Sequence, residues 1–111
     1  MYDCTRNFIN GQWVASHSGE IHDIINPANG QSIGKISFGN AQDVDQAVKA
    51  ARAAFESFSQ WTVQQRMDLL QAILDEFAKR HDEIGDAISA EMGAPIGLAR
   101  TAQAGSGPQH F

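Results

Sequence analysis

The sequence contains a single cysteine, Cys4, among its 111 residues. One thiol cannot close a disulfide within the chain, which fits the reducing cytoplasm rather than a disulfide-stabilised secreted domain. Long apolar runs are also missing, and none approaches the roughly 20 residues that cross a bilayer. The first residues, MYDCTRNFING, lack the apolar core of a signal peptide. We therefore expect a cytoplasmic protein that does not bind or span a membrane.

Positive charge is scarce as well. Eight Lys and Arg stand against thirteen Asp and Glu, which gives a formal net charge of -5, and the basic residues are scattered from Arg6 to Arg100. Nucleic acids and anionic membranes are bound through dense basic patches. No nucleic-acid partner is therefore expected, and the length allows one domain at most.

Strand signals occupy residues 7–39. Asn10 and Gly11 lie between short apolar runs and are typical of a two-residue hairpin turn, because both tolerate positive φ. Asn26–Gly30 forms a second turn, in which the proline presets φ and the glycine accepts a left-handed conformation. Gly34 is interpreted as the mark of a β-bulge. We predict three or four short antiparallel strands.

Helical signals occupy residues 40–104. Asn40 is a good N-cap, and Asp43 lies in the first turn, where the helix dipole favours an anion. The spacing predicts a helix over residues 41–57. Its apolar stripe consists of Val44, Val48, Ala51, Phe55 and Phe58.

Further helices follow. Thr62 and Gln65 form a capping box for the second helix, and a third is predicted from Asp82 to Met92. Gly93 is expected as its left-handed cap, with a proline beyond it. A last short helix spans residues 96–104. The predicted buried face of the second helix consists of Met67, Leu70, Ile73, Leu74 and Phe77.

The residues alone reveal no self-sufficient active site. None of the four histidines pairs with another histidine or with Cys4 at a metal-ligand spacing. Cys4 precedes the first hairpin and has no base near it in sequence. Gly105–Gly107 lacks the third glycine of a dinucleotide fingerprint, the lysine of a P-loop and a preceding strand.

Four blocks of sequence, taken together, suggest a family. FINGQWV, INPANGQSIGKI, DVDQAVKAARAAF and RMDLLQAILDEFAKRHDEIGDAISAEMGAPI follow one another over residues 8–96. This order resembles the N-terminal segment of the NAD(P)-dependent aldehyde dehydrogenases. The resemblance implies an α+β fold in which antiparallel β-hairpins precede three to four amphipathic helices. Residues 1–111 would then be an incomplete N-terminal part of the α/β, Rossmann-like cofactor domain of a larger enzyme.

The resemblance also implies an activity for the full-length enzyme. A cysteine thiolate attacks an aldehyde, hydride passes to NAD or NADP, and hydrolysis of the thioester releases a carboxylic acid. In this family the catalytic and cofactor-binding residues lie beyond the segment matched here, so none is assigned among the 111 residues. The segment is expected to be an inactive scaffold of a homo-oligomer. The alternative is a stand-alone, non-enzymatic interaction module built on the same scaffold.

One family site does reach this segment. Many members hold a monovalent cation with two main-chain carbonyls before the Asn-Pro turn and a carboxylate before the Gly-x-Pro. The matching positions are Ile24, Ile25 and Glu91. Oxygen ligands suit such hard cations, so these three residues are the expected metal ligands.

Overall fold

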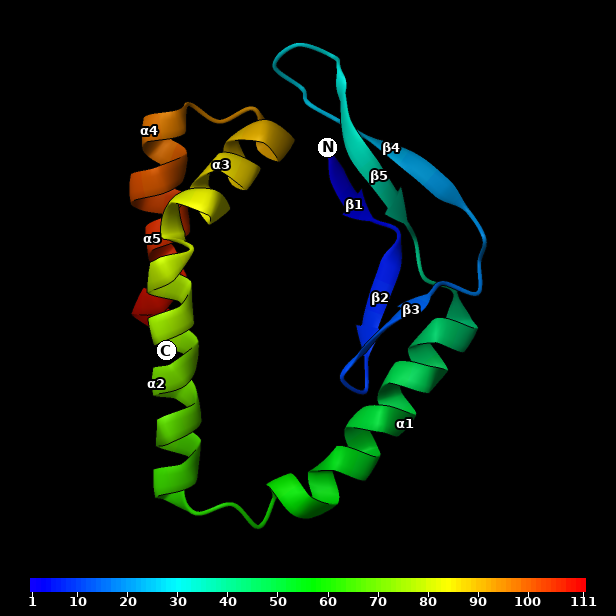
Figure 1. Ribbon diagram of the computed structural model, residues 1–111, viewed down its shortest axis with the longest axis vertical. Helices are drawn as coiled ribbons and strands as arrows, with labels where there is room; N and C mark the ends of the chain where they lie inside the picture. The colour runs from blue at the N-terminus through cyan, green and yellow to red at the C-terminus, as the bar shows by residue number, and fades with distance from the viewer. The chain divides into compact units, whose positions relative to one another are not determined.

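The computed structural model describes residues 1–111, and its contacts divide the chain into two compact units (Figure 1). The first unit comprises Met1–Ile25 and Ser32–Trp61, and the second comprises Asn26–Gln31 and Thr62–Phe111. The predicted α+β order, strands first and helices after them, is confirmed. None of the helices is long and apolar enough to cross a membrane.

The first unit contains two small sheets. One has the strand order β1-β5-β4, in which β4 runs antiparallel and β1 parallel to the central β5. The other is the antiparallel pair of β2 and β3. The strands are β1 (Tyr2–Cys4), β2 (Arg6–Ile9), β3 (Gln12–Ala15), β4 (Ile21–Ile25) and β5 (Ser32–Ser37).

The hairpin between β2 and β3 turns where the sequence predicts. Asn10 has φ 52° and Gly11 has φ 74°, so both central residues adopt the positive φ that a two-residue turn of this twist requires. Phe8 and Trp13 face each other across the pair, with ring centroids 5.1 Å apart. This cross-strand aromatic contact stabilises a hairpin that is otherwise largely exposed.

The prediction that strands begin at residue 7 was wrong, because β1 lies ahead of that range and pairs in parallel. The irregularity expected near Gly34 is present, since the pairing with β4 skips from Gly34 to Ser32. Gly34 has a second role that was missed. A Cβ at this position would collide with the main-chain oxygen of Tyr2, so glycine is what lets β1 approach β5.

Helix α1 (Ala41–Phe58) completes the first unit and begins as predicted. The side chain of Asn40 accepts hydrogen bonds from the backbone N–H groups of Gln42 and Asp43, and Asp43 closes a capping box on Asn40. The apolar stripe of α1 is not covered, since Val48 is 54% and Phe55 66% exposed. An open groove of about 350 Å³ separates its alanine face from the tip of the first hairpin.

The second unit is helical. Its elements are α2 (Val63–Lys79), α3 (His81–Met92), α4 (Ile96–Leu98), a π-helical segment (Ala99–Gln103), α5 (Ala104–Ser106) and a 3-10 turn (Pro108–His110). The capping box of Thr62 and Gln65 is confirmed, as is the left-handed Gly93, with φ 71°. The last helix extends beyond its predicted end, because Gly105 and Ser106 remain helical and Gly107 keeps a right-handed φ of -54°.

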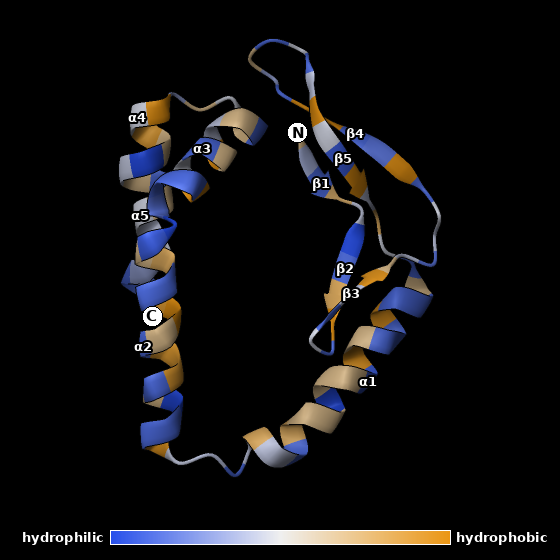
Figure 2. Cartoon of the chain, in the orientation of Figure 1, coloured by the Kyte–Doolittle hydropathy of each residue, from blue (hydrophilic) through white to orange (hydrophobic).

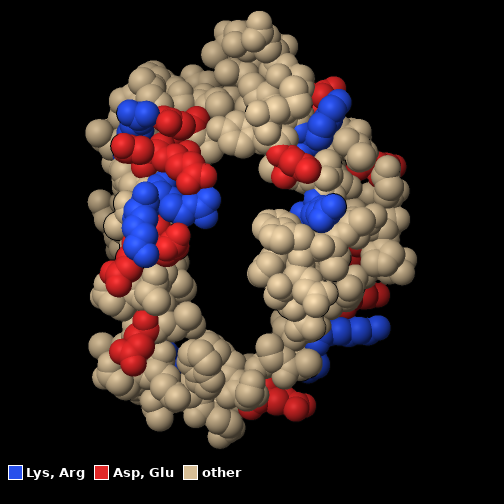
Figure 3. Space-filling view, viewed as in Figure 1, with Lys and Arg blue, Asp and Glu red and all other residues tan.

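Close packing in this unit depends on small groups. Ala99 and Ala104 are buried, and a Cβ on Gly85 in α3 would lie only 2.9 Å from the Cα of Arg100. The imidazole Nε2 of His81 donates to the carbonyl of Arg100 over 2.7 Å. Charged side chains of the helices pair locally, such as Arg100 with Asp86 at 2.7 Å, and Figure 3 shows acidic and basic atoms next to one another here.

The predicted buried face of α2 is not buried within these 111 residues. Met67, Leu70 and Ile73 are exposed, Leu74 and Phe77 are half-buried, and no residue of α2 is fully buried. Figure 2 shows that apolar residues recur along both α1 and α2. The periodicity is therefore real, but the described chain covers this face only in part, at its C-terminal end, where Gly107 approaches Phe77.

Candidate functional site

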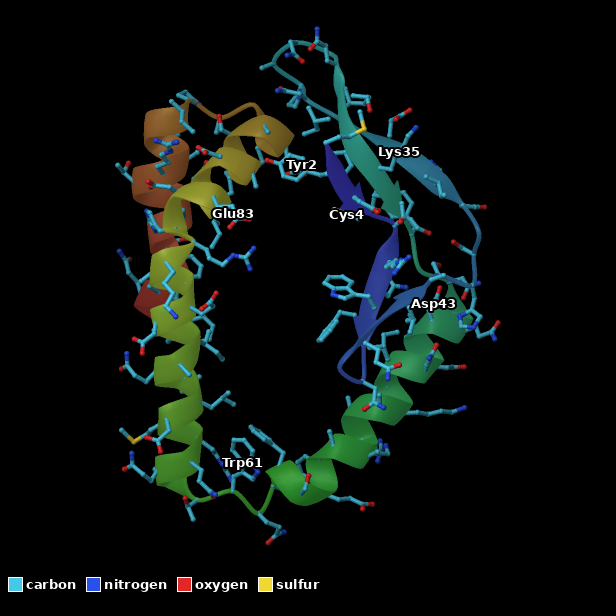
Figure 4. The ribbon with its side chains drawn as sticks, in the orientation of Figure 1. Tyr2, Cys4, Lys35, Asp43, Trp61 and Glu83 are labelled. Atoms are coloured by element: carbon cyan, nitrogen blue, oxygen red, sulfur yellow. The ribbon has the colours of Figure 1, made fainter.

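Asp43 is the most densely bonded polar side chain of the molecule. It lies in the first turn of α1, close to the strands (Figure 4), and is only 4% exposed. One carboxylate oxygen lies 2.7 Å from the His17 ring nitrogen Nδ1, and the other lies 2.7 Å from the Ser16 hydroxyl. The backbone N–H groups of His17 and Asn40 also donate to the carboxylate, at 3.0 Å and 2.9 Å.

These donors hold the pKa of Asp43 well below the usual carboxyl range. The backbone N–H of Asn40 contributes most, followed by the backbone N–H of His17, the Ser16 hydroxyl and the His17 ring. Both carboxylate oxygens are therefore engaged at neutral pH. Asp43 ties the loop after β3 to the start of α1, which is a structural role rather than that of a general base.

Sequence reasoning had assigned Asp43 to the helix dipole alone and missed its contact with the loop. Ser16 and His17 lie 27 and 26 residues away, beyond the reach of any local pattern. The two serines also reach the carbonyl of Phe38, since the Ser18 hydroxyl donates to it over 2.6 Å and the Ser16 oxygen lies 2.9 Å from it. Such short polar residues commonly cap loops in this way.

Cys4 is an exposed, free thiol on β1 (Figure 4). No side chain in the structure donates or accepts a hydrogen bond at its sulfur, so no base is positioned to activate it. No group of three or more His, Cys, Asp and Glu side chains is placed to hold a metal ion.

The residues predicted to hold a cation belong to different units. Ile24 and Ile25 are the last residues of β4, in the first unit, and Glu91 lies in the last turn of α3, in the second. Glu91 is exposed, and its carboxylate makes no hydrogen bond or ion pair within the chain. The cation site stays a prediction.

Residues 105–107 do not fit a dinucleotide phosphate. A phosphate loop needs backbone N–H groups that point together into an open turn. Gly105 instead lies within α5, and a Cβ on Gly107 would lie 3.1 Å from the ring of Phe77. The strand-to-helix connection between β5 and α1 contains a single glycine, Gly39.

Comparison with known proteins gives a consistent result. The model of the aldehyde dehydrogenase family matches residues 13–111. A curated protein of Staphylococcus aureus (strain bovine RF122 / ET3-1), named "Putative aldehyde dehydrogenase", is 43% identical over all 111 residues. The chain spans 23% of the length of that relative.

Solved structures agree with the sequence match. Aldehyde dehydrogenase C of Pseudomonas syringae, crystallised with NAD+ and octanal, is 36% identical, with a TM-score of 0.93 over 96% of this chain and 22% of that one. An NADP-dependent glyceraldehyde-3-phosphate dehydrogenase of Bacillus halodurans, complexed with NADP, is 30% identical, with a TM-score of 0.83 over 90% of this chain and 21% of that one. Structures similar to this chain thus include complexes with NAD and with NADP.

Proposed function

Because this chain belongs to the aldehyde dehydrogenase family, we propose that it forms the N-terminal scaffold of an enzyme that oxidises an aldehyde to a carboxylic acid. The nicotinamide of NAD or NADP accepts the hydride in this reaction. The observation that carries the proposal is the match of the family model over residues 13–111. The chain spans only 23% of the length of the curated relative, which favours a segment of a longer enzyme. In this proposal the enzyme is cytoplasmic and homo-oligomeric, and its catalytic cysteine and general-base glutamate lie outside these residues.

The exposed apolar faces of α1 and α2 support a scaffold role. Isolated surface leucines and phenylalanines are common, but a stripe repeated along two helices is typical of a surface that another element covers. Phe55 on α1 is 66% exposed and Met67 on α2 57% exposed. The remainder of the enzyme supplies the covering surface, and these helices in turn support it.

Within the scaffold, the residues of this chain hold structure rather than perform chemistry. Asp43 holds the loop after β3 by hydrogen bonds, and the missing side chain of Gly34 lets β1 pack against β5. The monovalent cation predicted at Ile24, Ile25 and Glu91 is retained as part of the proposal. It rests on the family resemblance and on the unpartnered carboxylate of Glu91.

The proposal is tested with the full-length protein encoded by the gene that contains this segment. We expect aldehyde-dependent formation of NADH or NADPH, followed by the absorbance of the reduced cofactor across a series of aliphatic and aromatic aldehydes. The 111-residue chain alone is the matched control and should form none. A folded full-length protein that reduces neither cofactor with any of these aldehydes would contradict the proposal.

The same exposed stripes favour a second candidate, a stand-alone interaction module that binds partner proteins through α1 and α2. Reading the encoding frame past the codon for Phe111 separates the two. Continuation into a region with the family's cysteine and glutamate supports the enzyme, and a stop codon supports the module.

A further inference from the structure

The turn that joins β4 to β5 is closed by its own hydrogen bonds. The backbone N–H of Asn26 donates to the carbonyl of Gln31 over 2.9 Å, and that of Gly30 donates to the carbonyl of Asn26 over 2.8 Å. The side chain of Asn26 accepts from the backbone N–H of Ala28 at 2.9 Å. The segment Asn26–Gln31 is therefore a preformed knob, and it belongs to the helical second unit.

This knob contacts the C-terminal end of α3 at Gly93. A Cβ added to Gly93 would lie 3.0 Å from the Cγ of Pro27, 3.4 Å from the backbone nitrogen of Ala28 and 3.6 Å from the Ala28 Cβ. Beyond Gly93, the hydroxyl of Ser89 donates to the carbonyl of Ala94 over 2.7 Å. The exit of the chain from α3 is thus fixed, and the space beside Gly93 is already filled.

Other left-handed glycines of the chain do not share this surrounding. Gly11, Gly19 and Gly30 have φ values of 74°, 68° and 71°, close to the 71° of Gly93. None of them has an atom within 4 Å of the position of an added Cβ. Gly93 therefore meets two requirements, a left-handed backbone and the absence of a side chain, whereas the other three meet only the first.

We propose that Gly93 is a positioning residue that seats the Asn26–Gln31 knob on the end of α3. A side chain here must push the knob back by a few tenths of an ångström, because the Cγ of Pro27 already lies 3.0 Å from the Cβ position and the closed turn restrains the backbone of Pro27. This role rests on the proposed function in one respect. Gly93 fixes the position of the knob relative to Glu91, the predicted cation ligand, which lies two residues before Gly93 on α3.

The test uses hydrogen–deuterium exchange on the full-length protein that carries this chain, with Gly93→Ala as the variant. We expect the amides of Ala28, Gly30 and Gln31, which are hydrogen-bonded within the knob, to exchange about ten-fold faster, because a knob pushed away from α3 opens its own hydrogen bonds more often. Gly19→Ala is the matched control. It imposes the same left-handed strain in open space and should leave these amides unchanged.

Two further variants separate the contact from the backbone strain. In a Pro27→Ala background, Gly93→Ala should accelerate exchange less than in the native background, since the nearest clashing atom is gone. Gly93→Asn tolerates the left-handed backbone but keeps a Cβ, so it should still loosen the knob.

Faster exchange at the end of α3 alone, with the knob unchanged, would overturn the inference and leave Gly93 as a simple helix cap. That outcome is independent of the proposed enzyme activity, because exchange needs no substrate. Loss of activity in the full-length enzyme with normal protection of the knob would likewise count against a positioning role for Gly93.

Discussion

Leu70 allows a direct measurement of whether another surface covers α2. Its side chain is 39% exposed in the described chain. Full burial of a leucine contributes about 1.5–3 kcal/mol, so covering the exposed part adds roughly 1 kcal/mol. Truncation of a covered leucine also leaves a cavity, which brings the expected cost of Leu70→Ala to about 2–5 kcal/mol in the full-length protein. In the 111-residue chain the cost should be smaller, about 1–2 kcal/mol, because only the part of Leu70 that is already buried there is lost and no covering surface is left with a cavity.

The assay is urea unfolding of both proteins followed by circular dichroism, with the free energy taken from the midpoint and slope. Gln71→Ala is the matched control. Gln71 lies next to Leu70 but donates only to the exposed Asp75, so its loss should matter little in either protein. A cost of Leu70→Ala that is equal in the two proteins would refute the reasoning, since it would mean that no additional surface covers this face.

Three other outcomes are expected. Gly34→Ala should release β1, because the new Cβ collides with the main-chain oxygen of Tyr2. Amide exchange at the first strand should then rise, while Gly97→Ala, in open space, should change nothing. Asp43 has a lowered pKa, so its stabilising effect is present above the ordinary carboxyl pKa of about 4 and is lost progressively below it. Unfolding midpoints of the native chain should fall with acidification in that range, and those of Asp43→Asn should fall less. Glu91→Gln should reduce the dependence of full-length activity on K+ concentration, and an unchanged titration would exclude Glu91 as a ligand.

Sequence reasoning located the features that depend on neighbouring residues. Asn40 and Thr62 begin helices as predicted, and the predicted capping box of Thr62 with Gln65 is formed, whereas the box that Asp43 closes on Asn40 was not predicted. Positive φ was also predictable at the hairpin turn of Asn10 and Gly11 and at the helix end of Gly93, because each is specified by the adjacent residues. These elements are specified within a few residues, which is the range in which propensity and turn chemistry act.

The missed features all depend on distant partners. β1 is three residues long and pairs with a strand some 30 positions later, so neither a neighbouring turn nor an apolar periodicity predicts this strand. The loop that engages Asp43 is equally remote. The apolar period of α2 was found, but periodicity says only that a face is apolar. Whether that face is buried depends on what lies against it, and Leu70 remains 39% exposed within this chain.

The parallel pairing of β1 also has a consequence for biosynthesis. Tyr2–Cys4 leaves the ribosome before its partner Ser32–Ser37, which is translated only after the two hairpin strands and β4. β2 and β3 are joined by two residues and can pair as soon as both have emerged. During synthesis β1 therefore stays without its sheet partner until β5 appears, so a strand made before the hairpin reaches its native pairing after it.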